Sequence, residues 1–272
     1  MEVLLLLINY NNNNEVISFV DIQLAMQKNV DYQVVIVNNG NQKILHADIK
    51  NISPDKVWTI NPEKNLGYLN GAHYAYEYYI EHSKSIPELI ILCNTDIEFS
   101  SESFIQNLLT FKKNNVGIIG PEIKSSLTGH FQNPIYEKRP DRTRLKIWLM
   151  FFSTYLTYLL YQSGAYLKRI IGNSIASEPS KDEREVYAVH GSFVIFTKEF
   201  FTKNCTLKYP SFLYCEELYL AEQCRLNNLR VVFLPSQKII HHEHSTSGIF
   251  KNRKHVSWLY ESVKFIFQTY FN

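Results

Sequence analysis

The chain has 272 residues, enough for one large α/β domain or two small ones with a sizeable core. Its 28 basic and 26 acidic residues leave a net charge of +2, which argues against a nucleic-acid-binding protein. The four cysteines form no CxxC pair and no zinc-type spacing, so we expect free thiols in a reducing cytoplasm.

Strand and helix signals alternate over the first 120 residues. Short apolar runs predict strands, and longer segments with helical spacing predict helices between them. This alternation is typical of βαβ units and predicts an α/β fold with a mainly parallel, Rossmann-like central sheet flanked by helices. The expected strands are 3–8, 33–37, 57–60, 89–93 and 116–119, the last ended by Gly120-Pro121, and the expected helices are 15–28, 71–82 and 103–113.

The middle of the chain has a different composition. Five basic residues lie within 138–146, an apolar aromatic run covers 147–161, and Lys168 and Arg169 follow. A bilayer span needs about 20 mainly apolar residues, so this run is marginal for crossing a membrane. Two interpretations remain open: a helix in the membrane interface, or a helix that covers the sheet or a dimer surface.

Strand and helix signals return in the last third of the chain. A polar, turn-rich loop is expected before them. An amphipathic helix is expected at the C-terminal end. In order, the expected elements are the loop 173–185, a strand over 186–197, a helix over 216–227, a strand over 230–234, the loop 238–248 and the final helix from His255.

Asp96 follows the predicted strand 89–93, within Asn94-Thr95-Asp96. Ligands of open α/β sheets gather beyond the carboxyl ends of the strands. A carboxylate at this place can hold a divalent cation against a phosphate, because hard cations prefer oxygen ligands. The alternative is an ordinary acidic residue in a turn or at a helix N-cap.

Asparagines follow the first two predicted strands. Asn9 and Asn11 come after the first, and Asn38 and Asn39 come after the second. If these strands are parallel neighbours, the amides lie at one edge of the sheet, where their donors and acceptors suit a nucleobase or a ribose. Asparagine is also common in turns, which is the alternative.

A glycine-containing segment, Asn65 to Gly71, precedes the second predicted helix. Gly67 and Gly71 would allow the backbone to approach a diphosphate near a helix N-terminus. The segment is neither a P-loop, since no Lys follows, nor a GxGxxG motif. An ordinary loop is the alternative.

Glu216 and Glu217 begin the helix predicted over 216–227. The helix dipole alone favours acidic residues in a first turn. Functionally, one carboxylate would be a general base and the other would position a substrate hydroxyl. Because they are adjacent in sequence, we expect the two side chains to point in different directions.

The sequence His241-His242-Glu243-His244 concentrates metal-binding side chains in a predicted loop. The cluster lacks the helical spacing of HExxH, so a zinc peptidase is disfavoured. One histidine from this loop would complete a metal site with Asp96. A surface loop rich in histidine is the alternative.

In their order along the chain, these segments resemble those of glycosyltransferase family 2, the GT-A fold enzymes that use nucleotide-sugar donors. The bacterial polysaccharide rhamnosyltransferase-like branch is most similar. The matching segments cover most of the chain: Ile8-Asn9-Tyr10-Asn11, Val35 to Gly40, Asn65 to Gly71, Leu92 to Asp96, Gly117 to Pro121, His190 to Phe193, Phe212 to Leu220, and His242 with Ser247-Gly248.

The resemblance implies a site for a nucleotide sugar and a metal ion. Asn94-Thr95-Asp96 occupies the position of the DxD motif, with Asn94 in place of the first Asp. Asp96 is then the direct ligand of Mg²⁺ or Mn²⁺, and His242 matches a loop histidine that completes this site. Asn38 stands where the family usually has Asp. The implied nucleotide-sugar contacts are Asn9, Asn11, Asn38, Asn39, Asn65, Gly67, Asn70, Asn94, Thr95 and Asp96.

The resemblance also implies the catalytic residues. Glu216-Glu217 matches the family's Glu-Asp pair, with Glu217 at the position of the base. In the same helix, Tyr219 and Gln223 stand where the family usually has Asp and Arg, and Arg225 matches a second basic position. The implied acceptor contacts are Gly191, Ser192 and Tyr214.

The implied activity is inverting transfer of a sugar from a dTDP- or UDP-sugar, dTDP-rhamnose among them. The acceptor would be a hydroxyl of a glycan or of an undecaprenyl-diphosphate-linked saccharide in cell-surface polysaccharide (capsule) synthesis. We expect one GT-A domain over 1–272: a nucleotide-sugar half (1–121), a helical or loop insertion (122–185), and an acceptor half with the C-terminal helix (186–272).

The resemblance implies a cytoplasmic protein held peripherally at the inner face of the cell membrane through 138–169, and a homodimer is an open alternative for this surface. Two rival functions remain. A nucleotidyltransferase would need a basic, glycine-rich signature near the first strand, and residues 9–14 contain no Lys or Arg. The other rival is a catalytically inactive GT-A domain that acts as a scaffold or glycan-binding partner.

Overall fold

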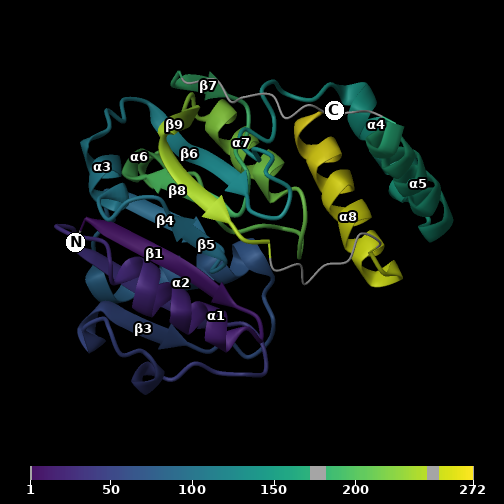
Figure 1. Ribbon diagram of the computed structural model, residues 1–272. Coiled ribbons are helices and arrows are strands. Elements are labelled where there is room, and N and C mark those ends of the chain that lie inside the picture. Colours follow the sequence, from purple (N-terminus) through teal and green to yellow (C-terminus); the bar gives the residue numbers. More distant parts are fainter. Residues whose placement is uncertain (1, 172–181, 244–250, 272) are drawn as a thin grey trace.

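The computed structural model describes residues 2–171, 182–243 and 251–271, and of residues 165–171 only the backbone. Within these residues, nine strands form one curled sheet with helices on both faces (Figure 1). The strands are β1 (Val3–Asn9), β2 (Tyr32–Asn38), β3 (Val57–Ile60), β4 (Leu89–Cys93), β5 (Ile97–Phe99), β6 (Val116–Ser125), β7 (Arg184–Val186), β8 (Phe193–Thr197) and β9 (Arg230–His241).

The helices account for most of the remaining described residues. They are α1 (Asn13–Ser18), the π-helical turn η1 (Phe19–Leu24), the 3₁₀ turns η2 (His46–Asp48) and η3 (Pro54–Lys56), α2 (Tyr68–Ser83), α3 (Phe104–Thr110), α4 (Arg142–Phe152), α5 (Tyr155–Ile171), α6 (Lys198–Thr202), α7 (Glu216–Leu226) and α8 (Arg253–Tyr270).

The sheet has the order β3-β2-β1-β4-β8-β6-β9-β5, and β7 pairs with β9. The first four strands are parallel neighbours, and β6 is parallel to β9. Because β8 runs antiparallel to both β4 and β6, those two groups point the same way. Six of the nine described strands therefore share one direction, which confirms the mainly parallel sheet expected from the sequence.

The topology brings distant segments to one edge of the sheet. β1, β2, β4 and β9 all end there, and the antiparallel strand β8 begins there, with Phe193 opposite Cys93. Asn94 to Asp96, Gly191-Ser192 and His241 are consequently neighbours at this edge. This is where ligands of open α/β sheets bind.

Two hydrophobic cores explain why the strands are apolar without alternation. In β1, Leu4 and Leu6 pack on the face covered by α2, α6, α7 and α8, whereas Leu5 and Leu7 pack on the face covered by α1, η1 and α3. Successive residues of a strand point to opposite faces. A strand buried on both faces therefore reads as a continuous apolar run.

Two strands are longer than predicted. β6 does not end at Gly120-Pro121 but continues to Ser125, and β9 continues through Pro235 to His241. The ladder between them is irregular at this place, because Pro121 pairs with Leu234 and Glu122 pairs with Lys238. Proline lacks an amide donor but is tolerated at such bulges, so neither proline ends its strand.

Other predicted elements differ in their bounds. The helix expected over 15–28 is α1 followed by η1, which ends at Leu24. The strand expected over 186–197 is split into β7 and β8, because the backbone turns at His190, whose Nδ1 accepts the amide of Ser192 at 3.2 Å. Most of the loop expected over 173–185 and part of the one over 238–248 lie outside the described residues.

The basic and aromatic segment forms a helical hairpin instead of one helix. The break between α4 and α5 contains Thr154, whose hydroxyl accepts the amide of Thr157 at 3.2 Å and so caps α5. The hairpin packs against α8 at one end of the molecule (Figure 1). Phe152, Tyr158 and Val263 are buried in this contact. Among the described residues, no helix has the length and apolar character to cross a bilayer.

Candidate active site

The turn that leads into α7 has an unusual backbone. Tyr214 and Cys215 both adopt left-handed conformations, with φ of +76° and +61°. Such conformations are unfavourable for residues other than glycine and persist only where neighbouring groups hold them. Here the hydroxyl of Tyr209 donates to the carbonyl of Tyr214 at 2.6 Å. The turn places Glu216 and Glu217 at the ligand-binding edge of the sheet.

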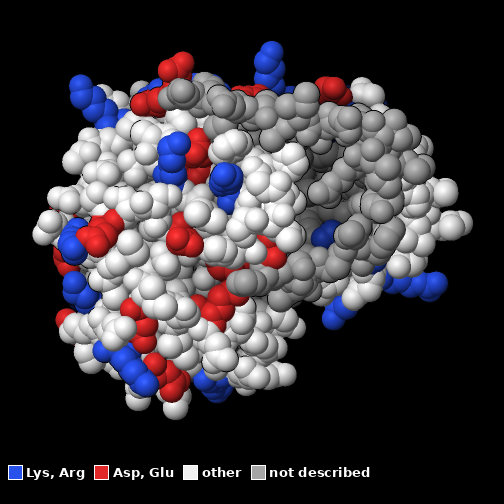
Figure 2. Space-filling view, viewed as in Figure 1, with Lys and Arg blue, Asp and Glu red and all other residues white. Residues whose placement is uncertain are grey.

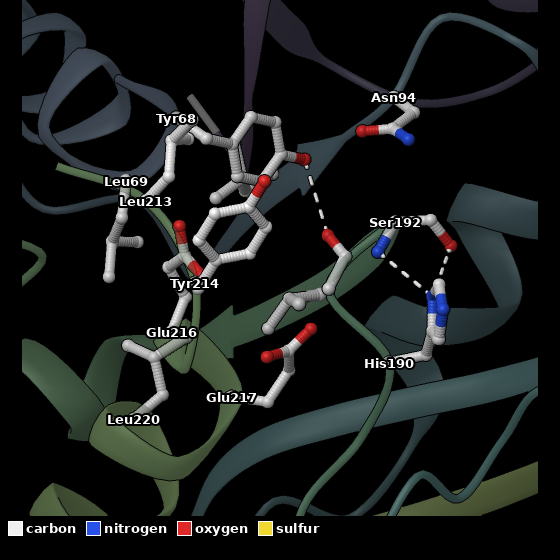
Figure 3. Close-up of a pocket in the computed structure, with 13 residues that line it drawn as sticks. Tyr68, Leu69, Asn94, His190, Ser192, Leu213, Tyr214, Glu216, Glu217 and Leu220 are labelled. Atoms are coloured by element: carbon white, nitrogen blue, oxygen red, sulfur yellow. Dashed lines mark hydrogen bonds between the residues drawn. The ribbon is translucent and has the colours of Figure 1, made fainter. Parts of the chain in front are cut away.

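The first cavity of this edge has a volume of about 240 Å³ (Figure 3). It brings together six residues that the sequence predicted for the site: Asn94, Gly191, Ser192, Tyr214, Glu216 and Glu217. Their segments are far apart in the chain. The other lining residues are Tyr68, Leu69, Leu92, His190, Leu213, Val194 and Leu220.

The two carboxylates of this cavity point in different directions, as expected for adjacent residues of a helix (Figure 3). Desolvation raises the pKa of Glu216 to about 8, and the charge of Glu217 contributes to this rise. Desolvation also raises the pKa of Glu217, while the backbone N–H groups of Glu217 and Gly191 oppose that rise. These N–H groups stabilise the anion at Glu217.

Gly191 approaches Glu217 more closely than any other residue type could. A Cβ atom at this position would lie 2.8 Å from Oε1 of Glu217. The carbonyl of Gly191 accepts a hydrogen bond from the hydroxyl of Tyr68 at 3.2 Å. Burial holds the pKa of Tyr68 well above its ordinary value, so this hydroxyl stays protonated and remains a donor.

If Glu217 is the base that the sequence predicts, Gly191→Ala should lower the rate of the reaction strongly while the protein stays folded. The added methyl group would displace the Glu217 carboxylate from the backbone amide that now fixes it. A displacement of about 1 Å in a reacting group can reduce the rate by roughly 10²-fold. Initial rates and thermal unfolding of both proteins test this. Full activity in Gly191→Ala would show that this contact does not position the carboxylate.

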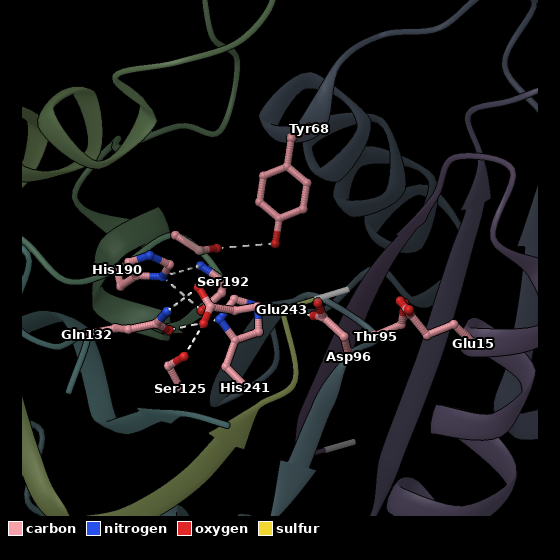
Figure 4. A network of polar contacts seen from close by, with 11 residues as sticks. Glu15, Tyr68, Thr95, Asp96, Ser125, Gln132, His190, Ser192, His241 and Glu243 are labelled. Carbon is pink, nitrogen blue, oxygen red and sulfur yellow. Dashed lines mark hydrogen bonds and ion pairs between the residues drawn. The ribbon is translucent and has the colours of Figure 1, made fainter. Parts of the chain in front are cut away.

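Asp96 and His241 form a second polar centre (Figure 4). Oδ1 of Asp96 lies 3.2 Å from Nε2 of His241, and both side chains are largely buried. Nδ1 of His241 lies 2.8 Å from Oε1 of Gln132, and Nε2 of Gln132 donates to Glu243 at 2.9 Å. Because that carboxylate can only accept, it orients the amide of Gln132 with its oxygen toward His241.

This arrangement fits a divalent cation. With its Nδ1 proton donated to Gln132, His241 directs Nε2 at the Asp96 carboxylate. Two acceptors at this distance repel unless a proton or a cation lies between them. Mg²⁺ is commonly held by one or two carboxylates together with substrate phosphates. Within the described ranges, no group of three or more His, Cys, Asp or Glu side chains could hold a metal ion.

The side chain of His241 lies against the Asp96 carboxylate, whereas the predicted ligand His242 meets Asp96 through its backbone N–H, which donates to the Asp96 carbonyl at 2.8 Å. β9 extends to His241, so successive side chains point to opposite sides. Nε2 of His242 lies 2.9 Å from Oε2 of Glu98 instead. His242 nevertheless lines the same cavity as Asp96, which has a volume of about 890 Å³ and also contains the predicted residues Asn11 and Thr95. The hydroxyl of Thr95 donates to Glu15 at 2.6 Å.

The predicted asparagines at the ends of β1 and β2 bond to the protein itself. Asn9, Asn38 and Asn39 are buried. The amide of Asn9 donates to Asn38 at 3.1 Å, and the amide of Asn38 donates to Asn61 at 3.0 Å. In this structure the amides hold the strand ends together, and their contact with a nucleotide stays a prediction.

Asparagines of the segment 65–71 also support the fold. Asn39 donates to the carbonyl of Gly67 at 2.9 Å, and Asn65 accepts the amide of Gly67 at 2.8 Å. Asn70 accepts the amide of Tyr209 at 2.8 Å. Gly67 has a φ of +82°, and a Cβ there would lie 2.1 Å from the carbonyl oxygen of Phe212. The segment thus positions the turn before α7, and no diphosphate contact is needed to explain its glycine.

Three residues of the two centres were not predicted: Tyr68, Gln132 and His190. His241 belongs to the histidine cluster from which one metal ligand was expected, although the resemblance favoured His242. Tyr68 and His190 lie within segments that the sequence singled out, but their residue types gave no reason to choose them. Burial lowers the pKa of His190 to about 4, so its ring is neutral and bonds Ser192 Oγ at 2.8 Å. Only the register of β9 distinguishes His241 from its neighbour.

No family model and no curated protein sequence matches this chain. Several solved structures match its fold. TarS of S. aureus has a TM-score of 0.53 and 12% identity over 89% of this chain and 37% of its own. The mannosyltransferase PcManGT of Pyrobaculum calidifontis, in complex with GDP-Man and Mn²⁺, has a TM-score of 0.53 and 11% identity over 90% of this chain and 58% of its own.

A third match is GalNAc-T7 with UDP, GalNAc and Mn²⁺, with a TM-score of 0.54 and 9% identity over 89% of this chain and 44% of its own. The chain therefore spans less than two thirds of each of these proteins. At such low identity the likeness shows the fold alone. It confirms the expected GT-A fold, a mixed α/β structure with a curled, mostly parallel sheet and a C-terminal helix.

Proposed function

We propose that this protein is an inverting glycosyltransferase that moves a sugar from a nucleotide-diphosphate donor to a hydroxyl group. One observation carries the proposal: at the same sheet edge, Glu217 lines one cavity and Asp96, which lies against His241, lines another, and the segment Asn94-Thr95-Asp96 borders both. A base for the attacking hydroxyl and a cation for the leaving diphosphate are the two groups that such a reaction needs. A mannosyltransferase in complex with GDP-Man and Mn²⁺ shares the fold.

The cavity of about 890 Å³ at the end of β1 would take the nucleotide, which we propose to be UDP or dTDP, with dTDP-rhamnose among the donors. Asn11 and Thr95 line this cavity. Asp96 and His241 would hold Mg²⁺ or Mn²⁺, which neutralises the charge of a departing diphosphate when it is bound. The two structural neighbours with a nucleotide or nucleotide sugar also contain Mn²⁺.

We assign the base to Glu217 and the neutral, positioning carboxyl to Glu216. The amides of Gly191 and Glu217 stabilise an anion at Glu217. Burial, and after it the charge of Glu217, raises the pKa of Glu216 to about 8, which keeps Glu216 protonated at neutral pH. A protonated Glu216 can donate to a substrate oxygen, whereas an ionised Glu217 can accept the proton of an attacking hydroxyl.

The acceptor we propose is a glycan or an undecaprenyl-diphosphate-linked saccharide of cell-surface polysaccharide synthesis, such as a capsule. The proposed halves are 1–121 for the donor and 186–272 for the acceptor, with the insertion 122–185 between them. Segment 138–169 would rest on the inner face of the cell membrane.

The surface of the α4–α5 hairpin supports this membrane contact. Met150, Leu156 and Leu160 are 59%, 69% and 61% exposed there, and basic residues begin α4. Figure 2 shows Lys and Arg side chains at the lower right, where α5 and α8 lie in Figure 1. Anionic headgroups attract such cations. A lack of binding to anionic vesicles at physiological salt would exclude this contact.

A thermal-shift panel of UDP-, dTDP- and GDP-sugars, each with and without Mn²⁺, tests the proposed function. A ligand that binds only the folded state raises Tm. At a ligand concentration of 100 times its Kd, the free energy of unfolding increases by about 2.7 kcal/mol. We expect a Mn²⁺-dependent rise with one nucleotide class. No rise with any donor would favour the inactive scaffold, since a scaffold has no need to bind a nucleotide sugar.

A further inference from the structure

Glu217 borders a second, smaller cavity in addition to the one described above. This cavity has a volume of about 200 Å³ and lies between the α4–α5 hairpin, α7 and α8. Its lining includes Trp148 and Phe152 of α4, Tyr161 of α5, and Leu259 of α8. The same carboxylate is thus part of the wall of two cavities, one toward Asn94 and one beneath the hairpin.

The lining of the cavity beneath the hairpin is mainly apolar. Apart from Glu217 it contains aromatic rings, aliphatic side chains and Cys215, with two tyrosine hydroxyls and the indole N–H of Trp148 as further polar groups and no second charged side chain. The guanidinium of Arg144 stacks on Trp148 and Tyr136, at 5.0 and 5.4 Å from the ring centroids, and holds these rings in place. Several sugar hydroxyls buried here would lack partners, which costs free energy for each unsatisfied group. An apolar chain fits the lining without that cost.

From this juxtaposition we propose that the cavity beneath the hairpin receives the apolar chain of an amphipathic acceptor, whose hydroxyl-bearing head lies at Glu217. The inference rests on the proposed function, since it takes Glu217 as the base. To the lipid-linked acceptor proposed above it adds the place where the alkyl or prenyl chain binds.

The position of the cavity agrees with a single displacement. An attacking oxygen and a leaving oxygen must approach the anomeric carbon from opposite sides. The diphosphate is proposed at Asp96, which lines the cavity of about 890 Å³, two residues after Asn94 of the first cavity. A hydroxyl held at Glu217 by a chain beneath the hairpin would enter from the other side of that carboxylate.

Calorimetric titration of the full chain with n-octyl β-glucoside, below its micelle concentration, and with methyl β-glucoside tests the proposal without any turnover. The two probes share a head and differ in the chain. We expect the octyl glucoside to bind at least tenfold more tightly. Trp148→Ala, which removes a wall, and Leu259→Phe, which fills the space, should each reduce this preference to less than threefold. Leu259→Phe keeps the interface filled if Trp148→Ala does not fold.

The matched control is Met150→Ser, which removes an exposed apolar side chain from the same hairpin. It should keep the preference for the octyl chain. Equal binding of both probes, or a preference lost in Met150→Ser and kept in Leu259→Phe, would overturn the proposal, because the chain would then bind the outer surface. The donor panel is independent: if it fails while the chain preference holds, the apolar cavity stands and the transferase assignment falls.

Discussion

Glu217→Gln is expected to lower the rate of sugar transfer by about 10²–10⁴-fold, the usual contribution of a positioned general base. Glutamine has the same shape and can still accept the amide of Gly191, so the fold and the donor affinity should be unchanged. Initial rates with donor and acceptor, together with the thermal shift by the donor alone, separate these effects. An unchanged rate would remove Glu217 from the chemistry.

The matched variant for this prediction is Glu216→Gln, at the adjacent position of α7. If Glu216 is protonated at neutral pH, as its pKa of about 8 implies, its replacement by a neutral amide should cost far less activity there. A large loss in Glu216→Gln with full activity in Glu217→Gln would reverse the two assignments.

The pH profile gives the same assignment an independent check. Burial raises the pKa of Glu217, so its ionised form and the rate should appear only above the usual titration range of a glutamate. Glu216→Gln removes a like charge when Glu216 is ionised and can only lower the pKa of Glu217. The acidic limb of kcat/KM should therefore stay in place or move to lower pH in this variant. A shift of the acidic limb to higher pH would contradict the electrostatic interaction between Glu216 and Glu217.

The central sheet was predictable because its strands are buried on both faces. Runs such as 89–93 contain no polar residue, so their type and bounds follow directly from composition. The ends of β6 and β9 were not predictable, since Pro121 and Pro235 normally interrupt pairing. Their tolerance depends on a bulge between two strands more than 100 residues apart, which no local pattern contains.

The candidate site was predictable to the level of segments. Glu216-Glu217, Gly191-Ser192 and Asn94 were expected there, and the structure brings them to one cavity. The roles of individual side chains at the strand ends were not predictable, because an amide that can bond a ligand can equally bond a neighbouring amide. Asn9 donates to Asn38, and only the tertiary structure shows which hydrogen-bond partner each amide has.

The hairpin of α4 and α5 is the element that the sequence analysis predicted least well. An apolar run over 147–161 was compatible with one interfacial helix, yet Ser153-Thr154 ends one helix and caps the next. Hydroxyl residues within an apolar run are local signals of a cap. The cavity between this hairpin and α8 depends on the turn between α4 and α5, so it could not be predicted from the sequence.

Asp96→Ala is expected to abolish the Mn²⁺-dependent part of donor binding and to lower turnover by about 10²–10³-fold. A cation at a leaving diphosphate supplies several kcal/mol of charge stabilisation, and each 1.36 kcal/mol is a factor of ten in rate. The readout that does not depend on turnover is the thermal shift by UDP or dTDP with and without Mn²⁺. Full metal dependence in this variant would show that the carboxylate holds no cation.

The neighbouring histidines provide the matched comparison for the metal site. His241→Ala should also remove most of the Mn²⁺-dependent shift, because Nε2 of His241 lies 3.2 Å from Asp96. His242→Ala should keep it, since His242 contacts Glu98. The opposite outcome would mean that the donor reorganises the end of β9 and brings His242 to the cation. The two variants therefore decide which histidine holds the cation together with Asp96. His241 would be selected by the register of β9, and His242 by a rearrangement of the end of β9 when the donor binds.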